Sequence, residues 1–187
     1  FPEFSALSSR GNNAEVETLA ARSFKYILFP VGVVAMILLV FAPDILELWI
    51  GRRFAVEAST VLRFFSVGIL VNSMAYVPFN LLQSVGRPDL PAKFHLLEFP
   101  IYLVLLWFFT GEFQIVGAAI AWLLRVILDL LLQFSWAVKL YPGIVKDLSR
   151  RRVWHEGGLL LVFGALLYLL RIIVNGLFPA VAGGGVL

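Results

Sequence analysis

The sequence predicts an all-α protein that crosses a membrane several times. Of its 187 residues, 60% are hydrophobic and only 14% are charged, a balance outside that of soluble domains. The apolar residues come in blocks long enough to cross a ~30 Å hydrocarbon core as helices. We therefore expect a polytopic helical bundle of about five to six membrane helices, with short amphipathic helices on the membrane surface.

Residues 1–25 form the first predicted unit, a polar and amphipathic segment on the cytoplasmic side. A helix start signal at Asn12-Asn13 precedes Val16, Ala20 and Phe24, which fall near one helical face. A short helix lying on the membrane surface is the expected form.

Residues 26–138 are predicted to form a transmembrane bundle of four helices. The first helix covers 26–42 and is closed by Pro43-Asp44, and the second covers 62–85. The stretch 45–58 between them carries Trp49 among several charges, which favours an interfacial re-entry. Because a proline lacks the N–H group and its ring clashes with the preceding turn, we expect a bend near Pro78.

The third and fourth predicted membrane helices cover 92–109 and 113–138. Only Thr110-Gly111-Glu112 separates them. A link this short leaves the fourth helix no path except back along the third, so the two should form an antiparallel hairpin.

The rest of the chain divides into a basic loop at 139–156 and a last unit at 157–187. The last unit is expected to hold one further membrane helix over 157–174 and, after residue 179, the start of another that the chain end cuts off, as in a fragment of a longer protein. Lys and Arg gather at the residue 1 end and in the 139–156 loop, so both should be cytoplasmic.

Ionisable residues inside the predicted spans are the candidate functional residues, because a charge in hydrocarbon is costly. Arg125 and Asp129 are four residues apart and share a helical face, and Glu98 falls at matching depth on the neighbouring span. Arg125 and Asp129 could be a pair that only stabilises the helix inside the bundle, or they could handle a substrate or ion, and Glu98 could join them in a cluster across two helices. The predicted cavity-lining residues are Arg125, Asp129, Glu98, Asn72, Asn80 and Arg63.

His95 and Glu98, three residues apart, leave a metal site, a titrating pair and plain hydrogen bonding open. The sequence shows no further ligand beside them, so we predict no metal and no other cofactor. No nucleophile sits beside a base and no phosphate-binding loop occurs, which predicts a protein that is not an enzyme. The basic residues form no stripe that could follow nucleic acid.

Several short motifs keep a characteristic order along residues 1–141. They are Phe1-Pro2, Leu48-Trp49-Ile50-Gly51 with Phe54-Ala55, Pro78 through Leu82-Gln83 to Gly86-Arg87-Pro88, and Gly117-Ala118-Ala119. In this order the chain resembles the C-terminal half of bacterial O-antigen and exopolysaccharide flippases, which share a superfamily with multidrug exporters.

The resemblance implies a second helix bundle that works with a first, missing bundle across a central cavity. It implies transport of a lipid-linked oligosaccharide from the cytoplasmic to the periplasmic leaflet of the inner membrane by alternating access, with that substrate, membrane lipids and the missing N-terminal bundle as partners. Arg125, Arg63 and Asn72 could cover its pyrophosphate headgroup. An ion-coupled multidrug exporter and a structural membrane subunit stay open as alternatives.

Overall fold

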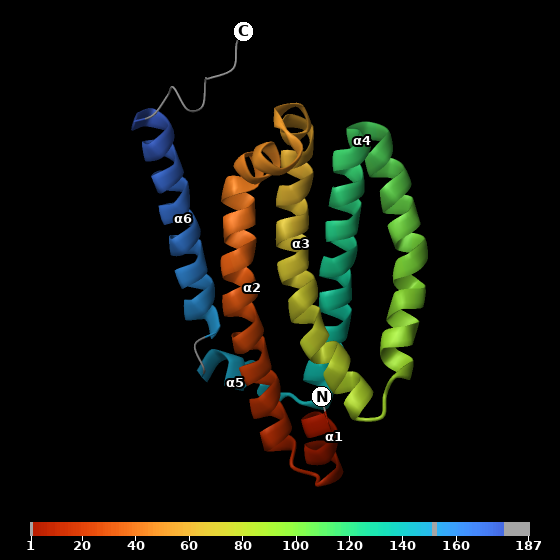
Figure 1. Cartoon of the computed structure of the whole chain (residues 1–187). Helices are drawn as coiled ribbons and strands as arrows, with labels where there is room; N and C mark the ends of the chain where they lie inside the picture. Colours follow the sequence, from red (N-terminus) through yellow and green to blue (C-terminus); the bar gives the residue numbers. More distant parts are fainter. Residues whose placement is uncertain (1, 151–152, 178–187) are drawn as a thin grey trace.

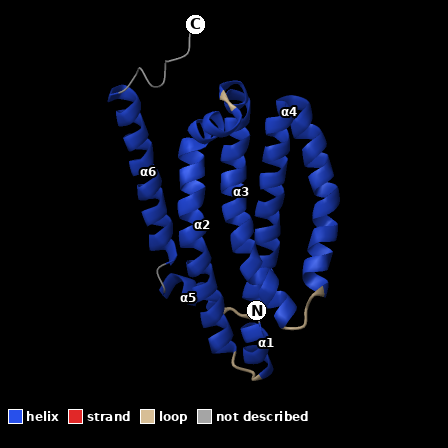
Figure 2. Cartoon of the chain, viewed as in Figure 1, coloured by secondary structure: helices blue, strands red, loops and turns tan. Residues whose placement is uncertain are grey.

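The computed structural model describes residues 2–150 and 153–177, in which every regular element is an α-helix (Figure 2). Four of the helices, α2, α3, α4 and α6, are long and apolar enough to cross a membrane, so the predicted all-α membrane bundle is confirmed. The helices are α1 (Pro2–Ser9), α2 (Asn13–Ile50), α3 (Arg52–Ser84), α4 (Asp89–Leu140), α5 (Gly143–Arg150) and α6 (Val153–Leu177). The helix expected after residue 179 lies outside the described residues.

Helix α2 begins at the predicted start signal but is longer than expected. The Asn12 side chain accepts a hydrogen bond from the backbone N–H of Glu15, 3.3 Å away, and so caps the helix. The helix then continues through Lys25 into the apolar block, so residues 13–25 are its first turns and not a separate surface helix. The physical reason is that Val16, Phe24 and Leu28 continue one buried face across Lys25 without a turn.

The far end of α2 bends where the sequence predicted that the first span ends. Phe41, two residues before Pro43, has non-helical dihedrals, and the helix resumes beyond it as far as Ile50. Gly51, with a φ of +92°, then reverses the chain into α3. Trp49 is 80% exposed in the segment beyond the kink, as expected of an interfacial aromatic residue.

Helix α3 stays continuous through Pro78. Unlike α2 and α4, it contains no residue with non-helical dihedrals, so the helix is not broken at Pro78. A smooth bend near Pro78 stays a prediction. The side-chain amide of Asn80 donates a hydrogen bond to the Tyr76 carbonyl, 2.6 Å away on the same helix.

Helix α4 is a hairpin of two arms, as the short link predicted. Gln114, with a φ of +50°, breaks the helix, and the chain runs back alongside itself (Figure 1). Phe94 of the first arm packs beside Trp136 of the second, with ring centroids 6.4 Å apart. At the turn, Gly117 lies against the Phe109 carbonyl so closely that no side chain would fit.

The short helices α1 and α5 lie at the same end of the bundle, opposite the turn of α4 (Figure 1). The predicted loop at 139–156 therefore contains a helix, α5, which Thr18 of α2 holds by donating a hydrogen bond to Asp147, 2.7 Å away. This co-location agrees with the prediction that both segments face one side of the membrane. Arg151 and Arg152 of that loop lie outside the described residues.

Helix α6 packs along α2, on the side away from α4 (Figure 1). Gly32 of α2 lies directly against the Leu160 side chain. Lys25 and Glu156 form an ion pair of 2.8 Å near the α5 end. Arg171 pairs with Asp44 at 3.0 Å and donates a hydrogen bond to the Val40 carbonyl, 2.9 Å away beside the α2 kink.

Candidate functional site

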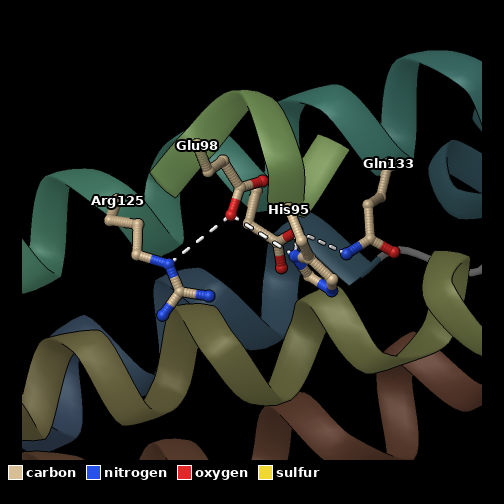
Figure 3. A network of polar contacts seen from close by, with 5 residues as sticks. His95, Glu98, Arg125 and Gln133 are labelled. Carbon is tan, nitrogen blue, oxygen red and sulfur yellow. Dashed lines mark hydrogen bonds and ion pairs between the residues drawn. The ribbon is translucent and has the colours of Figure 1, made fainter. Parts of the chain in front are cut away.

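A cluster of charged side chains lies between the two arms of α4, beside α3. His95 and Glu98 come from the first arm, one turn apart, and Arg125 and Asp129 come from the second, also one turn apart. Because the arms are antiparallel and turn at Gln114, the two pairs lie at the same level, and the labelled side chains converge in Figure 3. The predicted cluster of Glu98, Arg125 and Asp129 is confirmed.

Glu98 is the central acceptor of the cluster. Its Oε2 atom lies 3.5 Å from Nε of Arg125 and 3.5 Å from Nδ1 of His95. The side chain is 1% exposed, and its second oxygen, Oε1, is buried without a hydrogen-bond partner among the described residues. Arg125 therefore has a carboxylate partner, as expected because a lone charge inside a bilayer is costly.

Asp129 joins the cluster through two further contacts. Its Oδ1 atom accepts a hydrogen bond from the Gln133 amide, 2.5 Å away, and lies 3.7 Å from Nδ1 of His95. Gln133 is 1% exposed, and its own Oε1 atom has no partner among the described residues. The sequence analysis did not select Gln133, although its position four residues after Asp129 places it on the same helical face.

A cavity of about 210 Å³ lies between the cluster and α3. The first arm of α4 contributes His95, and α3 contributes mostly aromatic and small side chains. The lining residues are Asn72, Ala75, Tyr76, Phe79, His95, Arg125, Asp129 and Gln133. Of the six predicted cavity-lining residues, Arg125, Asp129 and Asn72 line it directly, and Glu98 is buried behind it.

Arg63 and Asn80 do not line this cavity. Arg63 is exposed on α3 and precedes Asn72 by nine residues, about 2.5 helical turns, which places it roughly on the opposite side of the helix. The side-chain amide of Asn80 donates its hydrogen bond to the Tyr76 carbonyl of the same helix. Helix rotation, which neither composition nor depth specifies, separates these two residues from the cluster.

The formal charges of the cluster do not cancel when His95 is neutral. Two carboxylates then face one guanidinium, and protonation of His95 would balance them. The sequence had offered His95 and Glu98 no third ligand, whereas the structure supplies Asp129, and potential ligand atoms of all three lie within 4.8 Å of one another. Arg125 already places a positive charge 3.5 Å from Glu98, so the protein itself supplies a counter-charge for one of the two carboxylates.

Comparison with known proteins finds a similar transporter. The chain is 34% identical over 99 residues to a Shigella flexneri protein named "Putative O-antigen transporter". The chain is thus similar to an O-antigen transporter over about half of its own length. No family model and no solved structure matches it.

The relationship to an O-antigen transporter confirms the resemblance found in the sequence. The aligned residues make up 53% of this chain and 24% of the relative, so the match spans about a quarter of the relative's length. This chain has four helices suited to a bilayer and is similar to a transporter, so it is a multi-pass membrane protein. Its charged cluster then lies inside a membrane-spanning helix hairpin, where ionisable side chains usually have a function.

Proposed function

We propose that the chain forms most of the second helix bundle of an inner-membrane transporter, and that the whole protein moves a lipid-linked oligosaccharide from the cytoplasmic to the periplasmic leaflet by alternating access. The relative named as an O-antigen transporter supports the substrate class. The missing N-terminal bundle and the surrounding membrane lipids are the proposed partners, with the residue 1 end and the 139–156 loop in the cytoplasm.

The observation that carries the proposal is the polar cavity beside Arg125. Arg125 is one third exposed, in contrast to the fully buried Glu98, so its guanidinium pairs with a carboxylate on one side and remains accessible on the other. An accessible arginine inside a bilayer suits the phosphate groups of a lipid-linked sugar, because the guanidinium can donate two parallel hydrogen bonds. Asn72, on the α3 side of the same cavity, adds a neutral polar group.

A second function is favoured by the same cluster. The buried carboxylates of Glu98 and Asp129 would also serve an ion-coupled multidrug exporter, in which acidic residues bind a cationic substrate or the coupling ion. Such an exporter would lower drug accumulation in cells and would leave surface polysaccharide unchanged.

The test compares arginine variants in the full-length parent, expressed in a strain that lacks its own O-antigen transporter. Arg125→Leu should abolish O-antigen on extracted lipopolysaccharide, while Arg125→Lys, which keeps the charge but loses the planar fork, should retain part of it. Arg63→Leu is the matched control, since it removes a cation from outside the cavity. Because Arg125→Leu is also expected to lose stability, O-antigen display is normalised to the abundance of each variant in immunoblots of membranes.

Full O-antigen display by Arg125→Leu would overturn the proposed role of the cavity. If the unmodified parent restores no O-antigen but raises drug resistance, the exporter is the correct reading. If it does neither, the chain belongs to the third class, a structural membrane subunit.

A further inference from the structure

We propose that a second, apolar cavity binds the acyl chain of an anionic phospholipid whose headgroup rests against α5. This cavity has a volume of about 350 Å³ and is lined by residues of α2, α3, the second arm of α4, α5 and α6. It shares no lining residue with the cavity beside the charged cluster. The proposal rests on the chain spanning a membrane and does not depend on the substrate that the parent transports.

The lining of the cavity matches an acyl chain. Phe24, Leu131, Phe134 and Leu148 are among its ten lining residues, and all ten are apolar. Its volume lies in the range of roughly 300–1,000 Å³ typical of small-molecule sites. Apart from the indole N–H of Trp154, the lining offers no hydrogen-bonding side chain, which disfavours sugars and nucleotides and favours a hydrocarbon.

The cavity is open to the side where lipid would enter. Leu131 and Trp154, both in the lining, are 60% and 75% exposed. At Gly157, also in the lining, an added Cβ would meet no atom within 4 Å. An indole at such an opening, next to a surface helix, suits the level of the lipid headgroups.

The position and charge of α5 indicate which lipid. Two of its apolar residues, Ile144 and Leu148, are buried, Leu148 within the cavity lining, while Val145, Lys146 and Arg150 are exposed. A short helix with a buried apolar face and exposed basic side chains is typical of the membrane interface.

The acidic side chains near α5 are engaged elsewhere. Asp147 accepts a hydrogen bond from Thr18, Glu17 accepts one from the backbone N–H of Gly143, and Glu156 pairs with Lys25. Lys146 and Arg150 form no ion pair with a described residue. The stretch 139–156 contains five basic and two acidic residues, so an anionic headgroup would be attracted beside the opening of the cavity.

The experiment counts lipids bound to the purified full-length parent by native mass spectrometry, with added phosphatidylglycerol or phosphatidylcholine. The parent should retain phosphatidylglycerol in preference to phosphatidylcholine. Gly157→Leu places a leucine side chain of α6 in the cavity and should reduce the retained phosphatidylglycerol several-fold. The neighbouring Gly158→Leu is the matched control, because Gly158 is exposed and does not line this cavity.

A second pair of variants separates the headgroup from the acyl chain. Lys146→Gln and Arg150→Gln should each lower the affinity for phosphatidylglycerol by roughly fivefold and leave phosphatidylcholine unchanged. A single elution peak in size-exclusion chromatography shows that each variant is folded.

Three results would overturn the proposal. The first is equal phosphatidylglycerol retention by Gly157→Leu and the parent, and the second is equal retention of the two lipids by the parent. The third is a cross-link to protein, not lipid, from a photoreactive group attached at Leu131→Cys, which would show a helix in the cavity.

Discussion

The Nε atom of Arg125 lies 3.5 Å from Oε2 of Glu98, across the two arms of α4. Arg125→Leu would leave the carboxylates of Glu98 and Asp129 buried without a guanidinium. We therefore expect the free energy of unfolding to fall by about 3 kcal/mol, the lower end of the range for breaking a buried ion pair. The double variant Arg125→Leu with Glu98→Gln removes both partners and should recover part of that loss. Thermal unfolding in detergent measures the difference, and strictly additive losses would contradict the pairing.

An exposed ion pair on the same helix provides the control. Lys93 and Asp89 are 3.1 Å apart at the start of α4, and both are well exposed. Lys93→Leu should change stability by less than about 1 kcal/mol because water screens the pair. A loss as large as that of Arg125→Leu would show that burial is not what makes the Glu98 pair important.

Arg171→Leu should detach the outer part of α6 from α2. It removes the ion pair to Asp44 and leaves the Val40 carbonyl without the hydrogen bond that it receives at the kink. Asp44→Asn should have a smaller effect, because the Asp44 side chain is half exposed and Arg171 can still donate to Val40. Limited proteolysis should cut α6 faster in Arg171→Leu than in Asp44→Asn, and the reverse order would contradict this role.

Gly117→Ala should disrupt the α4 turn. The added methyl group would collide with the backbone carbonyl of Phe109, which cannot rotate away as a flexible side chain could. Gly111→Ala is the control, since its Cβ would meet no atom within 4 Å and alanine favours a helix. Membrane abundance and melting temperature should fall for Gly117→Ala only, and equal behaviour of the two variants would count against the tight turn.

Gly68→Ala should weaken the packing of α3 on the second arm of α4. An added Cβ would enter the space of the Trp122 ring, which also packs edge-on against Phe65 with centroids 5.1 Å apart. We expect a loss of about 1–3 kcal/mol from overpacking. Combining Gly68→Ala with Trp122→Leu should remove the collision, so the double variant should lose less than the sum of the single changes in thermal unfolding.

Membrane sidedness can be tested with single cysteines, which this part of the parent lacks naturally. Cysteines at Lys146 and Glu15 should react with an impermeant maleimide only in inverted vesicles, because α1, α5 and the start of α2 lie at the proposed cytoplasmic end. Cysteines at Glu57 and Glu112, near the opposite end, should react in intact spheroplasts. Labelling of all four from one side would contradict the topology.

The sequence by itself determined the membrane class, the order of the helices and the α4 hairpin. These features depend on local quantities: the length of apolar blocks sets which helices can cross a bilayer, and a three-residue link permits only an antiparallel return. Depth within the bilayer is also local, because the rise per residue is fixed, and it was sufficient to bring Arg125 to the level of Glu98.

Only the tertiary structure decided which polar side chains meet. It brought Asp129 to His95 and Gln133 to Asp129, joined Arg171 to Asp44 across two helices, and turned Arg63 away from the cavity. Such contacts depend on how far each helix is rotated about its axis and on where neighbouring helices lie. In a chain whose helices are apolar on nearly every face, periodicity does not specify that rotation, and close packing at positions such as Gly32 and Gly68 does.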